Sequence, residues 1–413
     1  MSRIYSAPTI LLTILLTACS PGKESQDIVA ISIVGINDVH GALAAEGGQG
    51  GLISFSARID ALRKARGSDG GTVLLIDAGD MWQGTLESNL SEGAAVVQAY
   101  NEMGVTAATI GNHEFDFGPE GPKAIPANAT DDPRGALKKR IGETTFPVLT
   151  ANLIDETTGQ PVQWESLRPS VMIEAAGIKV GIIGVMTSNA LVTTIAANTT
   201  GLAVAPLAVS IGREAVRLRE TGAALVIVAA HAGGRCDDFS DASDLSSCAM
   251  NAEIMRVASD LEPGLVDHIV AGHNHNPIAH VVNGISITSN KSKILTFGRV
   301  DFYVDRTSGK TIGRKVFPPQ ENAADLSGQY EGHALVPDPD VVAIAEQALL
   351  QAEETKNREL GVRLTGPFEL IPDIESAMSN LMTEALLDSI DADIAVHNVF
   401  GGIRKGLPAG DLT

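Results

Sequence analysis

The stretch Gly111-Asn112-His113-Glu114-Phe115-Asp116-Phe117-Gly118 decides how the rest of the chain is interpreted. It follows the apolar run Ala107–Ile110, which predicts a short buried strand. Taken alone, Gly111 to Glu114 is explained equally well by a helix start capped by Asn112. Its meaning therefore depends on whether other strands end in similar side chains.

Four more groups of polar residues also follow apolar, strand-like runs. They are Asn37-Asp38-Val39-His40, Asp77-Ala78-Gly79-Asp80, His231 and Gly272-His273-Asn274-His275. The predicted strands are 28–36, 73–76, 107–110, 146–151, 178–185, 225–230 and 268–271. Helical patterns at 52–66, 94–103 and 209–221 lie between several of them. This alternation predicts an α/β fold.

The carboxyl ends of strands in an open α/β sheet converge on one crevice, so these distant groups are expected to meet. Each group alone has a plainer explanation, because Asp and His are common in turns and a lone histidine is usually structural. Together they supply nitrogen and oxygen ligands for two divalent ions, which we expect to be Mn, Zn, Co, Fe or Mg. The candidate ligands are Asp38, His40, Asp80, Asn112, His231, His273 and His275.

The composition of the chain narrows the class of substrate and partner. Its 413 residues are 44% hydrophobic and carry a formal net charge of −20, which suits a large globular protein and disfavours binding to a nucleic acid duplex. An anionic substrate would need a local positive centre, which bound metal can supply. The glycine-rich segment 47–51 lacks the Lys-Ser/Thr of a phosphate-binding loop and predicts a flexible connection.

The N-terminus and the cysteines indicate an oxidising compartment. The apolar run 10–18 is too short to span a bilayer and is typical of a signal peptide. It ends in Leu-Thr-Ala-Cys19, which resembles a bacterial lipobox and implies lipidation of Cys19. We expect a periplasm-facing protein anchored to the outer membrane; an ordinary signal peptide and a secreted periplasmic protein are the alternative. Cys236 and Cys248 are expected to form one disulfide, with two free thiols as the alternative.

The five groups, in their order along the chain, resemble the signature of the calcineurin-like metallophosphoesterases. Residues 111–118 resemble more narrowly the bacterial 5′-nucleotidase and UDP-sugar hydrolase family. The resemblance covers about residues 29–305 and implies a four-layer αββα sandwich. It also implies that Asp38, His40, Asp80 and His275 hold one metal, that Asp80, Asn112, His231 and His273 hold the other, and that Asp80 bridges them.

The chemistry of phosphate esters explains why such a site is needed. Two cations about 3.5–4 Å apart neutralise the ester and acidify a bridging water, so that hydroxide is present near neutral pH. A donor is also needed where charge develops on the leaving oxygen. His113 is the candidate donor, with Asp116 holding its ring, and the resemblance implies the same pair. Alternatively, His113 only orients Asn112.

The predicted domain organisation has five parts. They are a lipoprotein signal peptide (1–19), a linker (20–28), a metallophosphoesterase domain (29–320), a linker with a bridging helix (321–360) and the start of a truncated C-terminal nucleotidase domain (361–413). Residues 398–404 resemble the family's Asn-x-Gly-Gly-Ile-Arg substrate loop with one extra residue, which implies substrate contacts at Asn398, Gly401, Gly402 and Arg404. A truncated record, a disrupted gene and a metal domain that works without a complete partner domain all stay open.

We therefore expect hydrolysis of nucleotide phosphate esters of the 5′-nucleotidase type. Within enzymes, the alternatives are a 2′,3′-cyclic-nucleotide phosphodiesterase with 3′-nucleotidase activity and a UDP-sugar hydrolase, because the same metal centre serves monoesters and diesters. Outside enzymes, the alternative is a catalytically idle nucleotide-binding lipoprotein. In each case the expected partner is a small-molecule nucleotide or another phosphate ester, and the membrane is contacted only through the lipid anchor.

Overall fold

The computed structural model describes residues 27–371, 374–389, 392–397, 403 and 405–413. The predicted lipidation site Cys19 lies outside the described residues. So do the four predicted substrate residues, Asn398, Gly401, Gly402 and Arg404.

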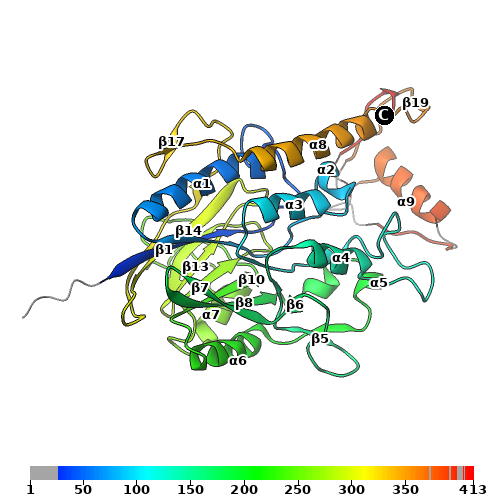
Figure 1. Ribbon diagram of the computed structural model, residues 1–413. Helices are drawn as coiled ribbons and strands as arrows, with labels where there is room; N and C mark the ends of the chain where they lie inside the picture. Colours follow the sequence, from blue (N-terminus) through cyan, green and yellow to red (C-terminus); the bar gives the residue numbers. More distant parts are fainter. Residues whose placement is uncertain (1–26, 372–373, 390–391, 398–402, 404) are drawn as a thin grey trace, which may run out of the picture.

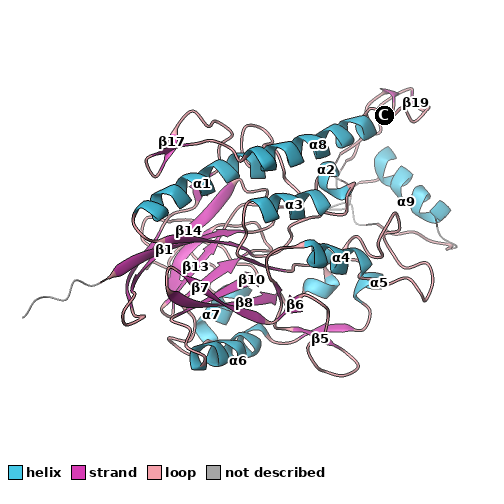
Figure 2. Ribbon diagram, in the orientation of Figure 1, coloured by secondary structure: helices cyan, strands magenta, loops and turns pink. Residues whose placement is uncertain are grey.

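Two stacked β-sheets form the centre of the molecule (Figure 2). The first sheet has the order β15 (Thr311–Val316), β14 (Thr296–Asp305), β1 (Ile28–Ile36), β2 (Thr72–Asp77), β3 (Ala107–Thr109), β4 (Val148–Leu149) and β6 (Leu167–Arg168), with β16 (Gln320–Glu321) paired to β14. The second has the order β12 (Ile278–Val282), β13 (Ile285–Ser289), β11 (His268–Ala271), β10 (Leu225–His231), β8 (Ile178–Met186) and β7 (Ser170–Ala175). The seven predicted strands correspond to β1, β2, β3, β4, β8, β10 and β11 and are confirmed.

Helices cover the outer face of each sheet, which gives four layers (Figure 1). Helices α1 (Leu52–Ser68), α3 (Ala94–Glu102) and α8 (Pro339–Lys356) lie over the first sheet, and α6 (Leu207–Glu220) and α7 (Glu253–Asp260) lie over the second. Strand β1 shows why both faces must be covered: Ile31 and Ile33 pack between the sheets, whereas Val34 and Ile36 pack under the helices. A strand buried on both faces has the continuous apolar sequence seen at 28–36. The predicted αββα sandwich is confirmed.

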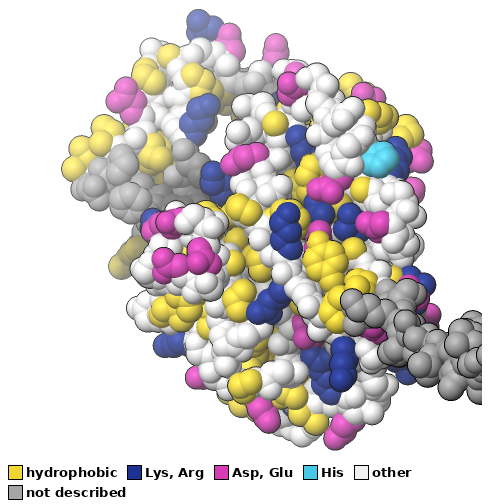
Figure 3. All heavy atoms as spheres, turned by 90° about the vertical axis from the view of Figure 1, so that its left-hand side faces the viewer, with side chains coloured by type: hydrophobic (Ala, Val, Ile, Leu, Met, Phe, Trp, Pro, Cys, Tyr) yellow, Lys and Arg dark blue, Asp and Glu magenta, His cyan; other side chains and the backbone are white. Residues whose placement is uncertain are grey.

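The strands that carry the candidate residues end at one edge of the sandwich. Strands β1 to β4 pair in parallel in the first sheet, as do β8, β10, β11 and β13 in the second. Figure 3 views the opposite edge, where β1 begins, and shows Lys and Arg interspersed with Asp and Glu among the coloured residues.

Helix α8 begins at Pro339 because Asp338 caps it. The Asp338 carboxylate accepts hydrogen bonds from the backbone N–H groups of Asp340 and Val341, and proline suits the first helical position. The buried face of α8, with Val341, Ala345 and Ala348, packs against α1, α2 (Leu86–Asn89) and α3. The predicted bridging helix is therefore part of the outer layer over the first sheet.

The remaining described elements are short or peripheral. They are α2 (Leu86–Asn89), α4 (Gly135–Glu143), α5 (Ala196–Thr199), α9 (Ala377–Ser389), β5 (Leu153–Asp155), β9 (Leu202–Val204), β17 (Gln329–Tyr330), β18 (His333–Ala334), β19 (Arg363–Leu364), β20 (Gly410–Asp411) and the 3-10 turns His113–Phe115 and Ala190–Val192. In α9, every residue keeps some exposure to solvent. Within the described part of the chain, no helix has both the length and the apolar character to cross a membrane.

Candidate metal centre

The seven predicted ligands lie at the converging strand ends: six are on the loops that follow the strands, and His231 is the last residue of its strand. The loop after β1 carries Asp38 and His40, the loops after β2 and β3 carry Asp80 and Asn112, and β10 ends at His231. Backbone hydrogen bonds join the first two loops, from Asp38 N to Gly79 O and from His40 N to Asp80 O, each 2.9 Å long. The pairing of β1 with β2 thus continues into the loops and fixes the two aspartates relative to each other.

The first group of ligand atoms comes from Asp38, His40 and His275. His40 Nε2 lies 3.1 Å from His275 Nε2, and His275 Nε2 lies 3.4 Å from Asp38 Oδ1. The other oxygen, Asp38 Oδ2, accepts hydrogen bonds from Asn37 Nδ2 at 2.7 Å and from the backbone N–H of His273 at 2.8 Å. The Asp38 carboxylate is therefore held by one oxygen and presents the second to the histidines.

The second group comes from Asp80, His231 and His273, with Asn112 between them. His231 Nε2 lies 3.1 Å from Asp80 Oδ2, 3.1 Å from Asn112 Oδ1 and 3.2 Å from His273 Nδ1. Asn112 Nδ2 donates to the carbonyl of Thr193 at 3.1 Å, so its oxygen is the atom turned into the group. The structure thus brings all seven predicted ligands into two adjacent groups.

The hydrogen bonds around the groups show that they fit cations. His40 Nδ1 faces the carbonyl of Gln83 at 2.9 Å and His231 Nδ1 faces that of Ala78 at 2.8 Å. A ring nitrogen facing a carbonyl carries the proton, so Nε2 of each ring presents a lone pair to the other acceptors. Asp38 Oδ1 is buried and accepts no hydrogen bond from any described residue. Acceptors gathered without hydrogens are stable only around a cation or an added proton.

The ionisation of the site leads to the same conclusion. Burial lowers the pKa of His231, but the adjacent Asp80 carboxylate raises it by more than burial lowers it, so that the pKa is about 10. Burial likewise raises the pKa of Asp80, yet its contacts with His231 bring that pKa well below the ordinary value. The position between His231 Nε2 and Asp80 Oδ2 therefore favours a positive charge.

Five of the seven residues have left-handed backbone conformations. The φ angles are +50° at Asp38, +48° at His40, +58° at Asp80, +82° at His273 and +57° at His275. Such conformations cost about 1–2 kcal/mol for a residue other than glycine and persist where the surroundings impose them, often at functional sites. Here they turn the side chains of each loop toward the shared crevice.

His113 and Asp116 lie beside the two groups. His113 Nδ1 lies 2.6 Å from Asp116 Oδ2, and Thr194 donates to Asp116 Oδ1 at 2.6 Å. Burial lowers the pKa of His113, but the hydrogen bond to Asp116 and the charge of Asp80 outweigh it, so the pKa lies above its ordinary value. The His113 ring packs edge-on to the His40 ring with 5.3 Å between their centres. The predicted pair is therefore in contact, next to the first group.

Glu114 is a supporting residue that the sequence analysis missed. It is fully buried, and its carboxylate accepts backbone N–H groups of Asp80 at 2.9 Å, Met81 at 2.7 Å and Gly111 at 2.6 Å. Burial and the charge of Asp80 raise its pKa to about 7. Glu114 thus joins the loops after β2 and β3. The position of Glu114 in the Asn-His-Glu sequence was the one sign of its role. Its partners could not be predicted, because they are backbone N–H groups, which are not specified by residue type.

Glycine at position 111 is required by close packing against Asp80. A Cβ atom there would lie 2.2 Å from Asp80 Oδ1, closer than any van der Waals contact allows. Part of the segment 47–51, which was predicted to be a flexible connection, is tightly packed, at Gly50 and Gly51. Cβ atoms at Gly50 and Gly51 would meet the backbone of Lys293 at 2.5 Å and of Ala44 at 2.4 Å, so these glycines allow tight packing between loops.

Cys236 and Cys248 form a disulfide in the structure. The ring of His280 is the third member of a group with these two cysteines, away from the seven residues above. The buried His268 has a structural partner, because its Nδ1 lies 2.9 Å from the carbonyl oxygen of Ser286.

A four-layer sandwich with ligand-type His, Asp and Asn side chains gathered at its converging strand ends is the arrangement expected of a metal-dependent phosphoesterase. The family described as Calcineurin-like phosphoesterase matches residues 31–277. The chain belongs to this family and is a phosphoric ester hydrolase. The predicted resemblance is confirmed.

Curated relatives extend the similarity over almost the whole chain. A cell wall protein of Listeria monocytogenes is 28% identical over 96% of this chain, which spans 53% of that protein. The protein UshA of Escherichia coli is 24% identical over 94% of this chain and 72% of its own length. A 5′-nucleotidase of Vibrio parahaemolyticus is 24% identical over 98% of this chain and 73% of its own length.

Solved structures show the same fold. A putative 5′-nucleotidase from Staphylococcus aureus superposes with a TM-score of 0.66 at 18% identity, covering 92% of this chain and 70% of that one. A 5′-nucleotidase precursor from Thermus thermophilus gives a TM-score of 0.61 at 22% identity, covering 93% and 72%.

Proposed function

We propose that the chain hydrolyses nucleotide phosphate esters, as a 5′-nucleotidase, with two divalent ions as cofactors. The observation that carries the proposal is the gathering of seven ligand-type residues in two adjacent groups whose acceptor atoms face one another. The relatives named UshA and 5′-nucleotidase support a nucleotide substrate. The ions would be Mn, Zn, Co, Fe or Mg, because mixed nitrogen and oxygen ligands accept all of these.

In this proposal Asp38, His40 and His275 hold one ion, and Asn112, His231 and His273 hold the other. Asp80 contributes to both ions. It belongs to the second group, and its negative charge also raises the pKa of His40 in the first group, against the lowering of that pKa by burial. Two ions bound there would neutralise the phosphate and supply hydroxide near neutral pH. The surrounding residues keep the ligands in place, through the hydrogen bonds of Asn37 to Asp38 and of Glu114 to the backbone of Asp80.

His113 is the proposed proton donor to the leaving oxygen. Its Nδ1–H donates to Asp116, so Nε2 is the atom that can carry a proton to substrate. The Asp116 carboxylate stabilises the protonated ring and is itself held by Thr194. A protonated histidine beside the crevice can assist departure of a poor leaving group such as a nucleoside alkoxide.

The remaining sequence-based assignments stay part of the proposal. The disulfide and the similarity to a Listeria cell wall protein support a location outside the cytoplasm. There the chain would face the periplasm, anchored through lipidated Cys19. Asn398, Gly401, Gly402 and Arg404 are the proposed substrate residues of the C-terminal segment.

An assay panel tests the proposal. Residues 20–413 are incubated with AMP, 2′,3′-cyclic AMP, UDP-glucose and bis-nitrophenyl phosphate, with and without a chelator. Chelator-sensitive release of phosphate from AMP, faster than turnover of the other three, is the expected result. Turnover of the cyclic nucleotide or UDP-glucose alone would replace the 5′-nucleotidase assignment, and bound metal without any turnover would reject catalysis.

A further inference from the structure

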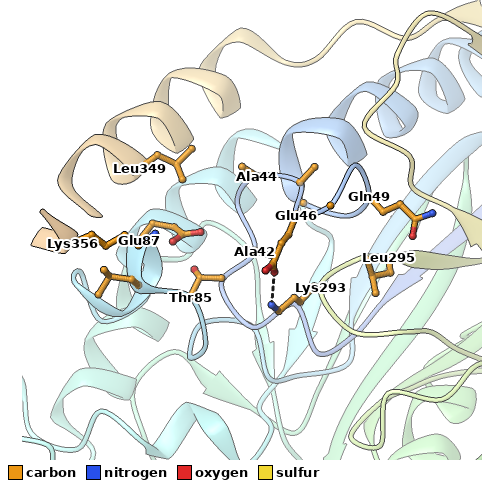
Figure 4. A pocket seen from close by; sticks show the side chains of 14 residues that line it. Ala42, Ala44, Glu46, Gln49, Thr85, Glu87, Lys293, Leu295, Leu349 and Lys356 are labelled. Atoms are coloured by element: carbon orange, nitrogen blue, oxygen red, sulfur yellow. Dashed lines mark hydrogen bonds and ion pairs between the residues drawn. The ribbon is translucent and has the colours of Figure 1, made fainter. Parts of the chain in front are cut away.

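Two pockets share part of their walls, and the smaller of them adjoins the candidate metal centre. The smaller, of about 300 Å³, is lined by His40, Gly84, Thr85, His275, Ser292 and Lys293. The larger, of about 670 Å³, lies between the loop 42–51, α2 and the end of α8 (Figure 4). Thr85 and Lys293 line both pockets, so a groove leads from the candidate ligands His40 and His275 past Lys293.

Lys293 is fixed relative to the metal centre through its backbone. Its N–H donates to the carbonyl of Asp38 at 2.8 Å, and its own carbonyl accepts the N–H of Gly51 at 3.1 Å. Lys293 and Ile294 have φ angles of +57° and +52°. A left-handed conformation is rare for a β-branched residue such as isoleucine and persists only where the surroundings impose it. The turn is thus held in an unfavourable shape that places Lys293 at the junction of the two pockets.

Lys293 differs in charge from the other residues that line the smaller pocket. It is the one Lys or Arg among the described residues that line the smaller pocket, in a chain with a net charge of −20. Its ammonium lies 2.8 Å from Glu46 Oε2, as Figure 4 shows, and the Glu46 side chain is 81% exposed. An ion pair exposed to this degree contributes little stability, so the ammonium can exchange Glu46 for an anionic ligand at small cost.

We infer that Lys293 and the smaller pocket form a second anion subsite beside the metal centre. The subsite would take the further phosphate of a substrate whose scissile phosphate belongs to a pyrophosphate, such as a nucleoside diphosphate or a nucleotide sugar. A lysine ammonium binds phosphate as a point charge with rotatable donors, which suits a group reached through a flexible bridge. This inference rests on the proposed function, because it requires a first phosphate at the ligands.

Binding calorimetry on the metal-loaded chain tests the subsite without turnover. The probes are the α,β-methylene analogue of ADP, with two anionic groups, and the 5′-phosphonate analogue of AMP, with one. Lys293→Met keeps the aliphatic stem and removes the charge, and Lys356→Met is the matched control because Lys356 lines only the larger pocket. Glu46→Gln releases Lys293 from its ion pair. Metal content and thermal unfolding are measured for each variant.

We expect Lys293→Met to weaken the diphosphate analogue about tenfold and the monophosphonate less than twofold, as for loss of one charge-assisted contact. Lys356→Met should change neither, and Glu46→Gln should tighten only the diphosphate analogue. Three results would overturn the subsite. They are equal losses for both probes in Lys293→Met, equal effects of the two lysine variants, and equal affinity of wild type for the two probes. If AMP is still hydrolysed in those cases, the proposed function stands; if wild type binds neither probe and hydrolyses nothing, both fail.

Discussion

Asp80 Oδ1 accepts the backbone N–H of His113 at 2.9 Å, while Asp80 Oδ2 lies 3.1 Å from His231 Nε2. One carboxylate therefore links the backbone of the candidate proton donor to the second ligand group. Any cation held by Asp80 fixes the position of His113 as well. In the proposed function, metal binding and proton donation would be coupled through Asp80, and substitutions at Asp80 and at His113 test the two roles separately.

Asp80→Ala is expected to lose both bound metal and activity. Removing the carboxylate leaves His231, Asn112 and His273 without their anionic partner, and it deprives both ions of a shared ligand in the proposed arrangement. Metal per chain, measured by mass spectrometry after dialysis, should fall with phosphate release. A variant that retained two ions and turned over substrate would remove Asp80 from the bridging role.

His113→Asn is expected to keep its metals and lose rate in a way that depends on the leaving group. A nucleoside alkoxide needs a proton as it departs, whereas nitrophenolate does not, and general acid catalysis typically contributes about 10²–10⁴-fold. The comparison is kcat for AMP against kcat for nitrophenyl phosphate in both proteins. Equal losses on the two substrates would reject proton donation and favour a role in orienting Asn112.

Asp116→Asn is expected to shift the pH profile. The pKa of His113 lies above its ordinary value of 6.5 because the Asp116 hydrogen bond and the Asp80 charge outweigh burial. The acid form is present below this pKa and is lost as the pH rises through it, so activity on AMP should fall on the alkaline side. Without the Asp116 charge the pKa falls, and the alkaline limb of kcat/KM should move to lower pH. An unmoved limb would assign it to another group.

Glu114→Ala is expected to destabilise the fold as well as the site. Three buried N–H groups lose their acceptor, and each buried unsatisfied group costs about 1–3 kcal/mol. Glu114→Gln, which keeps the shape and one acceptor oxygen, should be milder. Denaturant unfolding of the two metal-free variants measures the difference. Equal stability of the alanine variant and wild type would show that these hydrogen bonds do not hold the two loops together.

The strand ends could be predicted because their signal is local. The apolar runs before Asp38, Asp80 and His273 are buried on both faces, and such runs are recognisable in one sequence. The convergence of the loops then follows from the parallel pairing of the strands. This is why the seven candidate ligands meet although Asp38 and His275 are far apart in the chain.

The supporting residues could not be predicted because their partners depend on tertiary packing. Thr194 reaches Asp116 from the turn after β8, and Lys293 is placed by the carbonyl of Asp38 and the N–H of Gly51. Backbone groups are present at every position and carry no sequence signal. Helix α8 was predicted as a helix, but its packing on α1, α2 and α3 depends on small residues such as Ala345 and Ala348, which fit many surfaces.

The most direct test of the account is the metal content of residues 20–413 measured together with AMP hydrolysis during chelation and metal return. We expect two divalent ions per chain, loss of phosphate release as they are removed, and recovery when they are restored. Full hydrolysis of AMP by a chain that holds no metal would contradict it.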